Sequence, residues 1–260
     1  MPLKISLMDA EHLLSHLEQH MHRVQRLCLT FLVGRVEKVD TLLSVPLFAT
    51  PAPVLEGLHL TFDANTNLGN HAFVPRLFDN TARLTRAYFK RCLPWPHNTF
   101  PHLTHIFVGC AYAAYNNPPI AEVLDFLEGS PNLEEVVLDG VKVGDLPPSQ
   151  SSRIVSLPCL RSVVLDNCES LLECFIGHVI PSETVALRCD WFDDAPKGAT
   201  WRFDILQSGA PFFSRISPVK ELSFWTTDYV CGEFCFACRD LVGCVTFNAV
   251  LGYSLTIGRR

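Results

Sequence analysis

The sequence predicts an α/β fold in which irregular repeats build a curved, mostly parallel sheet with helices on its outer face. Three observations lead to this prediction. A short apolar phrase recurs along nearly the whole chain, proline precedes most of its copies, and amphipathic helix patterns occupy several of the intervals. Strands and helices that alternate in this way are typical of a parallel sheet with helices packed outside it.

The recurring phrase is Leu-x-x-Leu-x-Leu, in which other apolar residues can replace leucine. Its copies start near residues 24, 55, 84, 103, 133, 160, 185 and 219, and the copy at 185 is degenerate. The first five steps range from 19 to 31 residues, close to the period of leucine-rich repeats. A strand with apolar residues at every second position cannot bury that face alone, so neighbouring units must stack. We therefore expect one leucine-rich-repeat-like solenoid domain over residues 1–260.

Particular residue types stand at both ends of the phrase. Proline has no N–H and is suited to the position just before a strand or at its start. The prolines ahead of five copies are Pro53, Pro101, Pro131, Pro158 and Pro218. A small or hydrogen-bonding residue closes several copies, as at Cys92 and Cys168, and fits a tight bend there.

Three amphipathic segments predict helices, each followed by a strand of the repeat. They span residues 9–20, 118–128 and 170–179, and each carries apolar residues at helical spacing. Asp9 and Asn117 are the candidate N-caps of the first two, because short polar side chains can accept hydrogen bonds from the first free N–H groups.

The bulk composition indicates a globular protein with a sizeable apolar core. Hydrophobic residues make up 48% of the chain and charged residues 18%, below the typical value of about 25%. The formal charge is −6 and no run of Lys or Arg occurs, which argues against nucleic acid as a partner. A signal-peptide pattern and an apolar stretch near the ~18 residues of a membrane span are both missing. We expect a soluble protein with neither membrane nor nucleic-acid partners.

The cysteines indicate a reducing compartment, either cytoplasm or nucleus. There are eleven, an odd number, and most stand in apolar runs, among them Cys28, Cys159 and Cys168. Disulfide scaffolds are usually shorter and less aliphatic. We expect these cysteines to be free and to pack as small hydrophobic residues.

One cysteine cluster near the end of the chain could hold a metal. Cys231, Cys235 and Cys238 have the spacing with which radical S-adenosylmethionine enzymes bind a [4Fe–4S] cluster, and Cys244 could complete a zinc site. Those enzymes place the motif early and usually have an aromatic residue at the position of Ala237. We interpret the segment as apolar and metal-free, and a metal-dependent enzyme or zinc site built on this cluster remains the alternative.

Two further groups have simpler structural interpretations. His12, His16 and His20 follow one another at helical spacing and could share a metal, but they stand apart from the leucine stripe and so predict a solvated helix face. The acidic residues on both sides of Trp191 are typical of a turn. No phosphate loop, nucleophile elbow or dinucleotide fingerprint occurs, so we expect neither a catalytic residue nor a cofactor.

The residues between the core positions of each strand are expected to point to the concave face of the sheet and to bind a protein. Aromatic and arginine residues on such a face are typical interface anchors. The face changes from basic to acidic along the chain, so a partner with the opposite charge order would fit it. The candidate partner-binding residues are Arg86, Tyr88, Lys90, His105, Phe107, Glu135, Asp139, Asp166 and Trp225.

Several segments resemble the repeat region of basidiomycete F-box proteins. They read Pro51-Ala-Pro-Val-Leu-Glu-Gly-Leu-His-Leu60, Ser130-Pro-Asn-Leu-Glu-Glu-Val-Val-Leu138 and Arg153-Ile-Val-Ser-Leu-Pro-Cys-Leu-Arg-Ser-Val-Val-Leu165. Residues 2–29 are similar to the segment that follows the F-box in that family. The resemblance covers nearly the whole chain, and the helical F-box of about 40–50 residues is not recognised in it.

The resemblance implies a non-enzymatic module that corresponds to the substrate-recognition half of a ubiquitin-ligase subunit. Its partner would be a protein of unknown identity. A ubiquitin-ligase adaptor would be a second partner only if the full gene product carries an F-box. A truncated paralogue without a retained function is the remaining alternative.

Overall fold

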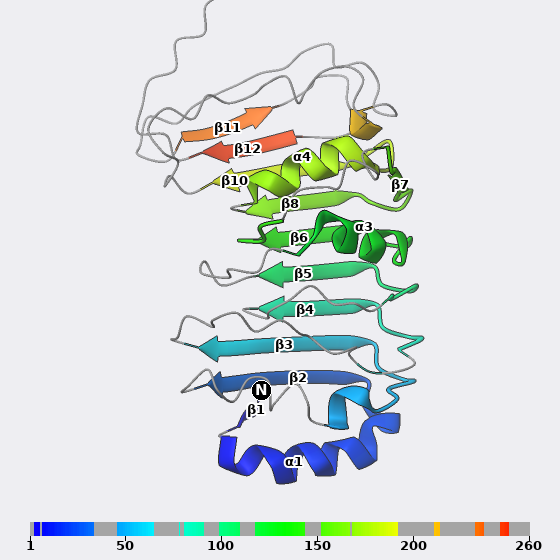
Figure 1. The fold of residues 1–260 in the computed structure, drawn as a ribbon, viewed down its shortest axis with the longest axis vertical. Coiled ribbons are helices and arrows are strands. Elements are labelled where there is room, and N and C mark those ends of the chain that lie inside the picture. The colour runs from blue at the N-terminus through cyan, green and yellow to red at the C-terminus, as the bar shows by residue number, and fades with distance from the viewer. Residues whose placement is uncertain are drawn as a thin grey trace, which may run out of the picture.

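A long sheet runs along the whole molecule in the computed structural model (Figure 1). The structure describes residues 3–5, 7–33, 46–64, 78, 81–90, 99–109, 118–143, 152–166, 168–191, 211–213, 232–236 and 245–249. Within them the sheet has ten strands in the order β1-β2-β3-β4-β5-β6-β8-β10-β12-β11. All neighbouring strands are parallel except the pair β11 and β12. The predicted α/β class with a mostly parallel sheet is confirmed.

The strands occur where the recurring phrase predicts them. From β2 to β10, each strand of the long sheet begins one or two residues after the start of a phrase, whereas β1, β11 and β12 belong to no copy. The phrase near 219 lies outside the described residues. The strands are β1 (Leu3–Ile5), β2 (Arg26–Val33), β3 (Gly57–Ala64), β4 (Arg86–Lys90), β5 (His105–Gly109), β6 (Glu135–Asp139), β8 (Ser162–Asp166), β10 (Ala186–Trp191), β11 (Gly232–Phe236) and β12 (Val245–Ala249).

A tight turn ahead of the strands explains the prolines. The N–H of Leu103 donates to the carbonyl oxygen of Phe100 at 3.0 Å, and the same bond recurs between Leu160 and Leu157 at 3.1 Å. Pro101 stands second in its turn, where its fixed φ suits the backbone and its missing N–H costs no bond. Proline therefore belongs to the turn four residues before the strand, and not to the strand's own start. Pro218 lies outside the described part of the chain.

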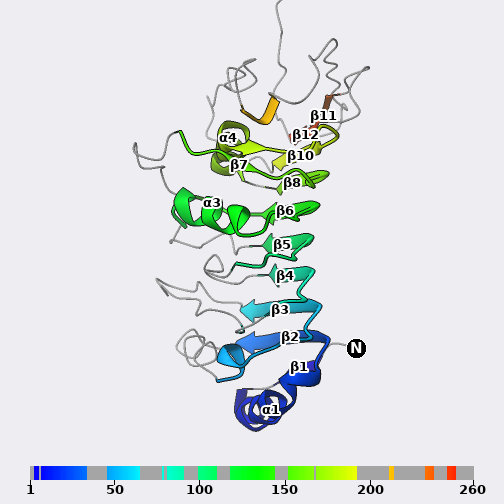
Figure 2. The same cartoon turned by 90° about the vertical axis from the view of Figure 1, so that its right-hand side faces the viewer.

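All three predicted helices are present. They are α1 (Leu7–His20), α3 (Ile120–Glu128) and α4 (Glu169–His178). α1 lies at the N-terminal end of the sheet, and α3 and α4 cover one face (Figure 2). The remaining elements are the short parallel strands β7 (Val155–Ser156) and β9 (Val179–Ile180) and the 3-10 helices η1 (Met21–Arg23), η3 (Pro46–Ala49) and η6 (Pro211–Phe213).

The predicted N-caps need correction. Asp9 lies inside the first turn of α1, because the strong helix formers Leu7 and Met8 extend the helix upstream. Pro119 occupies the cap position of α3 and offers no side-chain hydrogen bond, while Asn117 lies outside the described residues. Among the described residues, no helix is long and apolar enough to cross a membrane.

The core lies between the sheet and the helices that cover it. Each strand of the long sheet from β3 to β8 turns two side chains inward, and these stack across the units: Leu58 and Leu60, Ala87 and Phe89, Ile106 and Val108, Val136 and Leu138, and Val163 and Leu165. α3 closes this layer with four buried side chains, Val123, Leu124, Phe126 and Leu127. Apolar residues at period two thus share one continuous core, as the phrase requires.

Whether a described cysteine is buried depends more on its position in the fold than on its residue type. Cys168 is buried at the bend after β8, where its Sγ lies 3.0 Å from the carbonyl oxygen of Asp166 and accepts the N–H of Val141 at 3.3 Å. This confirms a small, hydrogen-bonding residue at the end of the phrase. The burial predicted for Cys28 and Cys159 is wrong, because both are exposed. Cys28 alternates with buried core residues of β2, and Cys159 lies in a turn.

Candidate functional site: the open face of the sheet

The face of the sheet opposite α3 and α4 holds the predicted binding residues, and no helix in the described part of the chain covers it (Figure 2). We call it the open face. Its side chains alternate along each strand with the buried core residues and are half-buried or exposed. Trp225 lies outside the described residues. The other eight predicted residues are all on this face, at Arg86, Tyr88 and Lys90 of β4, His105 and Phe107 of β5, Glu135 and Asp139 of β6, and Asp166 of β8.

The parallel register arranges the open face in three rows that cross the strands. The first row contains Arg26, Gly57, Arg86, His105, Glu135 and Ser162. The central row contains Cys28, His59, Tyr88, Phe107, Val137, Val164 and Arg188. The third row contains Thr30, Thr61, Lys90, Gly109, Asp139 and Asp166. Each unit from β2 to β8 therefore contributes one residue to each row.

Three rings of the central row form a stack, which we call the aromatic ladder: His59, Tyr88 and Phe107. The ring centroids of His59 and Tyr88 are 4.2 Å apart at an interplanar angle of 18°. Those of Tyr88 and Phe107 are also 4.2 Å apart, at 10°. Neighbouring strands lie about 4.8 Å apart, so in-register residues on three strands bring their rings to stacking distance. Such ring pairs contribute about 0.5–1.5 kcal/mol each beyond the burial of area.

A glycine on the same strand makes room for the last ring of the ladder. A Cβ atom at Gly109 would lie 2.9 Å from Cε1 of Phe107 and 3.1 Å from its Cζ. The ring of Phe107 therefore lies over Gly109, two residues further along β5, in space that any other residue would fill. Sequence reasoning missed the role of this glycine because it depends on the direction of the Phe107 side chain.

The charges of the open face are separated along the sheet. Arg26, Arg86 and Lys90 are exposed on β2 and β4, whereas the carboxylates of Glu135, Asp139 and Asp166 stand on β6 and β8. The boundary is marked by His105 and Glu135, whose Nε2 and Oε2 atoms lie 3.8 Å apart. The predicted change from basic to acidic is thus present in the positions of the residues, with Arg188 of β10 adding a positive charge at the far end.

The aromatic ladder is uncharged near neutral pH. Burial lowers the pKa of His59 below its ordinary value of 6.5, and the nearby charge of Lys90 lowers it further. Burial raises the pKa of Tyr88, and the negative charge of Asp139 acts in the same direction. Neutral His59 makes a hydrogen bond of 3.0 Å between its Nε2 and Oγ1 of Thr61. An uncharged, largely aromatic strip therefore lies among charged side chains.

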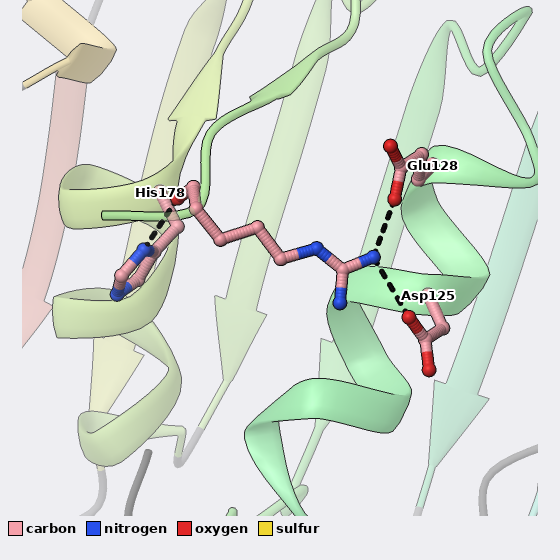
Figure 3. Close-up of polar contacts among 4 residues, drawn as sticks. Asp125, Glu128 and His178 are labelled. Atoms are coloured by element: carbon pink, nitrogen blue, oxygen red, sulfur yellow. Dashed lines mark hydrogen bonds and ion pairs between the residues drawn. The ribbon is translucent and has the colours of Figure 1, made fainter. Parts of the chain in front are cut away.

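A polar cluster on the covered face has a structural role (Figure 3). The guanidinium of Arg153 lies 2.7 Å from the carboxylate of Asp125 and also binds Glu128, both on α3. Nδ1 of His178 on α4 donates to the carbonyl oxygen of Arg153 at 2.8 Å. Burial lowers the pKa of Arg153, but the hydrogen bonds and charges of the two carboxylates outweigh it and raise that pKa. The cluster thus joins α3 to α4.

Among the residues that the structure describes, the candidate metal ligands are not brought together into a metal site. On α1, His16 and His20 are exposed with their ring centroids 4.8 Å apart. Within the described residues, no three His, Cys, Asp or Glu side chains gather closely enough to hold a metal ion. Cys235 stands on β11, and the other cysteines of that cluster lie outside the described part of the chain.

No protein-family model, curated protein or solved structure matches the chain. Function is therefore inferred from the residues of the open face.

Proposed function

We propose that the chain is a non-enzymatic protein-interaction module, built as a leucine-rich-repeat-like solenoid, that binds a protein partner through its open face. The observation that carries the proposal is the aromatic ladder. Single apolar residues are common on protein surfaces, but His59, Tyr88 and Phe107 are stacked in register on three neighbouring strands. Large, rigid side chains of this kind typically anchor protein interfaces.

A repeated backbone pattern supports the solenoid. The carbonyl oxygen of Glu56 accepts the N–H groups of Thr85 and Arg86 at 3.0 and 3.1 Å. The carbonyl oxygen of Thr104 accepts those of Glu134 and Glu135 at 2.8 and 3.0 Å in the same way. The residue just before each strand is thus bonded to the next unit, which is how a repeat protein stacks through contacts between neighbours.

The charge distribution supports a protein as the partner. Positive side chains on β2 and β4 and negative ones on β6 and β8 would steer and orient a chain of the opposite charge order. A uniformly basic face, as nucleic acid would favour, is not formed by the described residues. The resemblance to basidiomycete F-box proteins agrees with this, and under it the open face would select the protein that a ubiquitin ligase modifies.

The proposal can be tested by capturing partners with and without the ladder. A tagged chain would be compared in a fungal extract with the double variant Tyr88→Ala and Phe107→Ala. The captured partner should fall about tenfold or more, because truncating an interface anchor commonly costs about 2 kcal/mol. The matched control is His16→Ala with His20→Ala, two exposed rings on α1. Equal capture by both variants, with both folded by circular dichroism, would show that the ladder binds no partner.

A further inference from the structure

The aromatic ladder ends in a step at β6. Phe107 is followed in the central row by Val137 and Val164, which are half-buried and much shorter than a ring. Tyr88 covers one face of the Phe107 ring, and the two ring planes differ by only 10°. The second face of that ring therefore turns toward β6, above Val137. We call the surface over Val137 and Val164 the valine step.

Carboxylates stand on both sides of the valine step. Glu135 and Asp139 are two residues before and after Val137 on β6, so both share its face of the sheet at about 7 Å along the strand. Asp166 is the neighbour of Asp139 on β8. The carboxylate Oδ2 of Asp139 lies 3.7 Å from the point where a Cβ of Gly109 would stand, and Phe107 Cε1 lies 2.9 Å from that point. The edge of the Phe107 ring and the carboxylate of Asp139 thus both lie close to Gly109 on the open face of β5.

We propose that the valine step is the subsite for an arginine side chain of the protein partner. This inference rests on the proposed function and specifies its chemistry. A planar guanidinium would continue the stack as the next layer on Phe107, with Val137 beneath it and the carboxylates of Glu135 and Asp139 at its edges. Arginine fits better than lysine, because its planar, weakly hydrated guanidinium group both stacks on aromatic rings and forms paired hydrogen bonds with carboxylates.

His105 and Arg188 lie at the borders of the valine step on the open face. His105 already lies near Glu135, but a carboxylate can accept about four hydrogen bonds, so both contacts are compatible. Arg188 lies two strands beyond Val137, at about 10 Å, and limits the extent of the acidic region.

The register also sets the spacing expected in the partner. The cations Arg86 and Lys90 lie on β4, two strands or about 10 Å from β6, which equals about three residues of a chain in the polyproline II conformation, where residues three apart share a face. A partner segment that crosses the strands would therefore carry an acidic residue about three positions from the arginine, in either chain direction.

A selection experiment tests the subsite without a known partner. A phage-displayed library of random 12-residue peptides would be selected on the immobilised full chain. Arginine should be enriched, with an acidic residue about three positions away. For the best peptide, Asp139→Asn in the protein, or arginine to lysine in the peptide, should each weaken binding about tenfold. Glu183→Gln, an exposed carboxylate in the turn before β10, is the matched control and should change nothing.

The outcomes separate the two proposals. Selected peptides that lack arginine but lose binding on Tyr88→Ala would overturn the arginine subsite and leave the interaction module in place. Peptides whose binding is unchanged by Tyr88→Ala and by Phe107→Ala would overturn the open face as the binding site. A selection without binders counts against the subsite too, because a random library contains the acidic-x-x-arginine spacing many times. If Asp139→Asn unfolds the chain, Glu135→Gln gives the same test.

Discussion

Replacing Gly109 by alanine should displace one ring of the aromatic ladder without adding charge or disturbing the core. The added Cβ would lie 2.9 Å from Cε1 of Phe107, closer than carbon atoms can pack, but 3.7 Å from Oδ2 of Asp139, which is an ordinary contact. The ring is the far end of a side chain on the open face, so it can rotate away while the backbone of β5 stays in the sheet.

The expected change in stability is small because two effects oppose each other. Alanine in place of glycine restricts the unfolded chain and stabilises a strand by about 0.5–1 kcal/mol. Loss of the stack between Tyr88 and Phe107 removes about 0.5–1.5 kcal/mol. The free energy of unfolding should therefore change by less than about 1 kcal/mol, whereas binding of a partner or selected peptide through the ladder should fall.

Three measurements check this prediction. Urea unfolding gives the stability, and the aromatic resonances of Phe107 and Tyr88 in NMR report the stack, because stacked rings shift each other's signals. The matched control is Gly57→Ala on the same face, whose Cβ would meet Cγ of Arg26 at 3.6 Å, an ordinary contact. Unchanged ring resonances in Gly109→Ala, or a loss of several kcal/mol, would refute the geometry of the ladder.

Three further predictions concern other described residues. Arg153→Ala should lower the free energy of unfolding in urea by about 1 kcal/mol, because the contacts of Figure 3 with two exposed carboxylates are lost. An unchanged free energy of unfolding would show that these contacts do not stabilise the fold. Lys90→Gln should raise the pKa of His59 in an NMR titration yet leave it below 6.5, because burial is the larger cause. In the unmodified chain, the contribution of neutral His59 to stability is present above pH 6.5 and is lost as the pH falls through the lowered pKa. Ser130→Ala should leave the unfolding free energy unchanged or raise it by up to about 1 kcal/mol, because its buried Oγ has no hydrogen-bond partner among the described residues; a clear loss would contradict this.

The strands could be predicted because stacking imposes one rule on every unit. Each copy of the phrase needs apolar residues at alternate positions to share the core, so the pattern survives although the steps vary from 19 to 31 residues. β11 and β12 were not predicted because they carry no copy of the phrase. The burial of Cys28 was wrong for a related reason: residue type was given more weight than its place between Leu27 and Leu29.

The composition of the site could be predicted, but its geometry could not. Alternation alone assigns Tyr88 and Phe107 to the open face. Their stacking, the inclusion of His59 and the space over Gly109 depend on a register that joins strands from separate repeats and on side-chain directions. The valine step likewise exists only as a contrast between neighbours in a row, which are 30 residues apart in the chain at Phe107 and Val137.

The alternation along each strand places the side chains that stabilise the core and the side chains proposed to bind a partner on opposite faces of the sheet. On β4, Phe89 is buried in the core, and its replacement by alanine would cost about 3–5 kcal/mol, enough to unfold many domains. Its neighbour Tyr88 is half-buried on the open face, where truncation removes stacking contacts and little of the shared core. Residues of the open face can therefore change from unit to unit at low cost to folding, while the register keeps them in rows about 4.8 Å apart. A surface of this kind can be altered toward a new extended ligand one position at a time, which is what the proposed protein-interaction module would require.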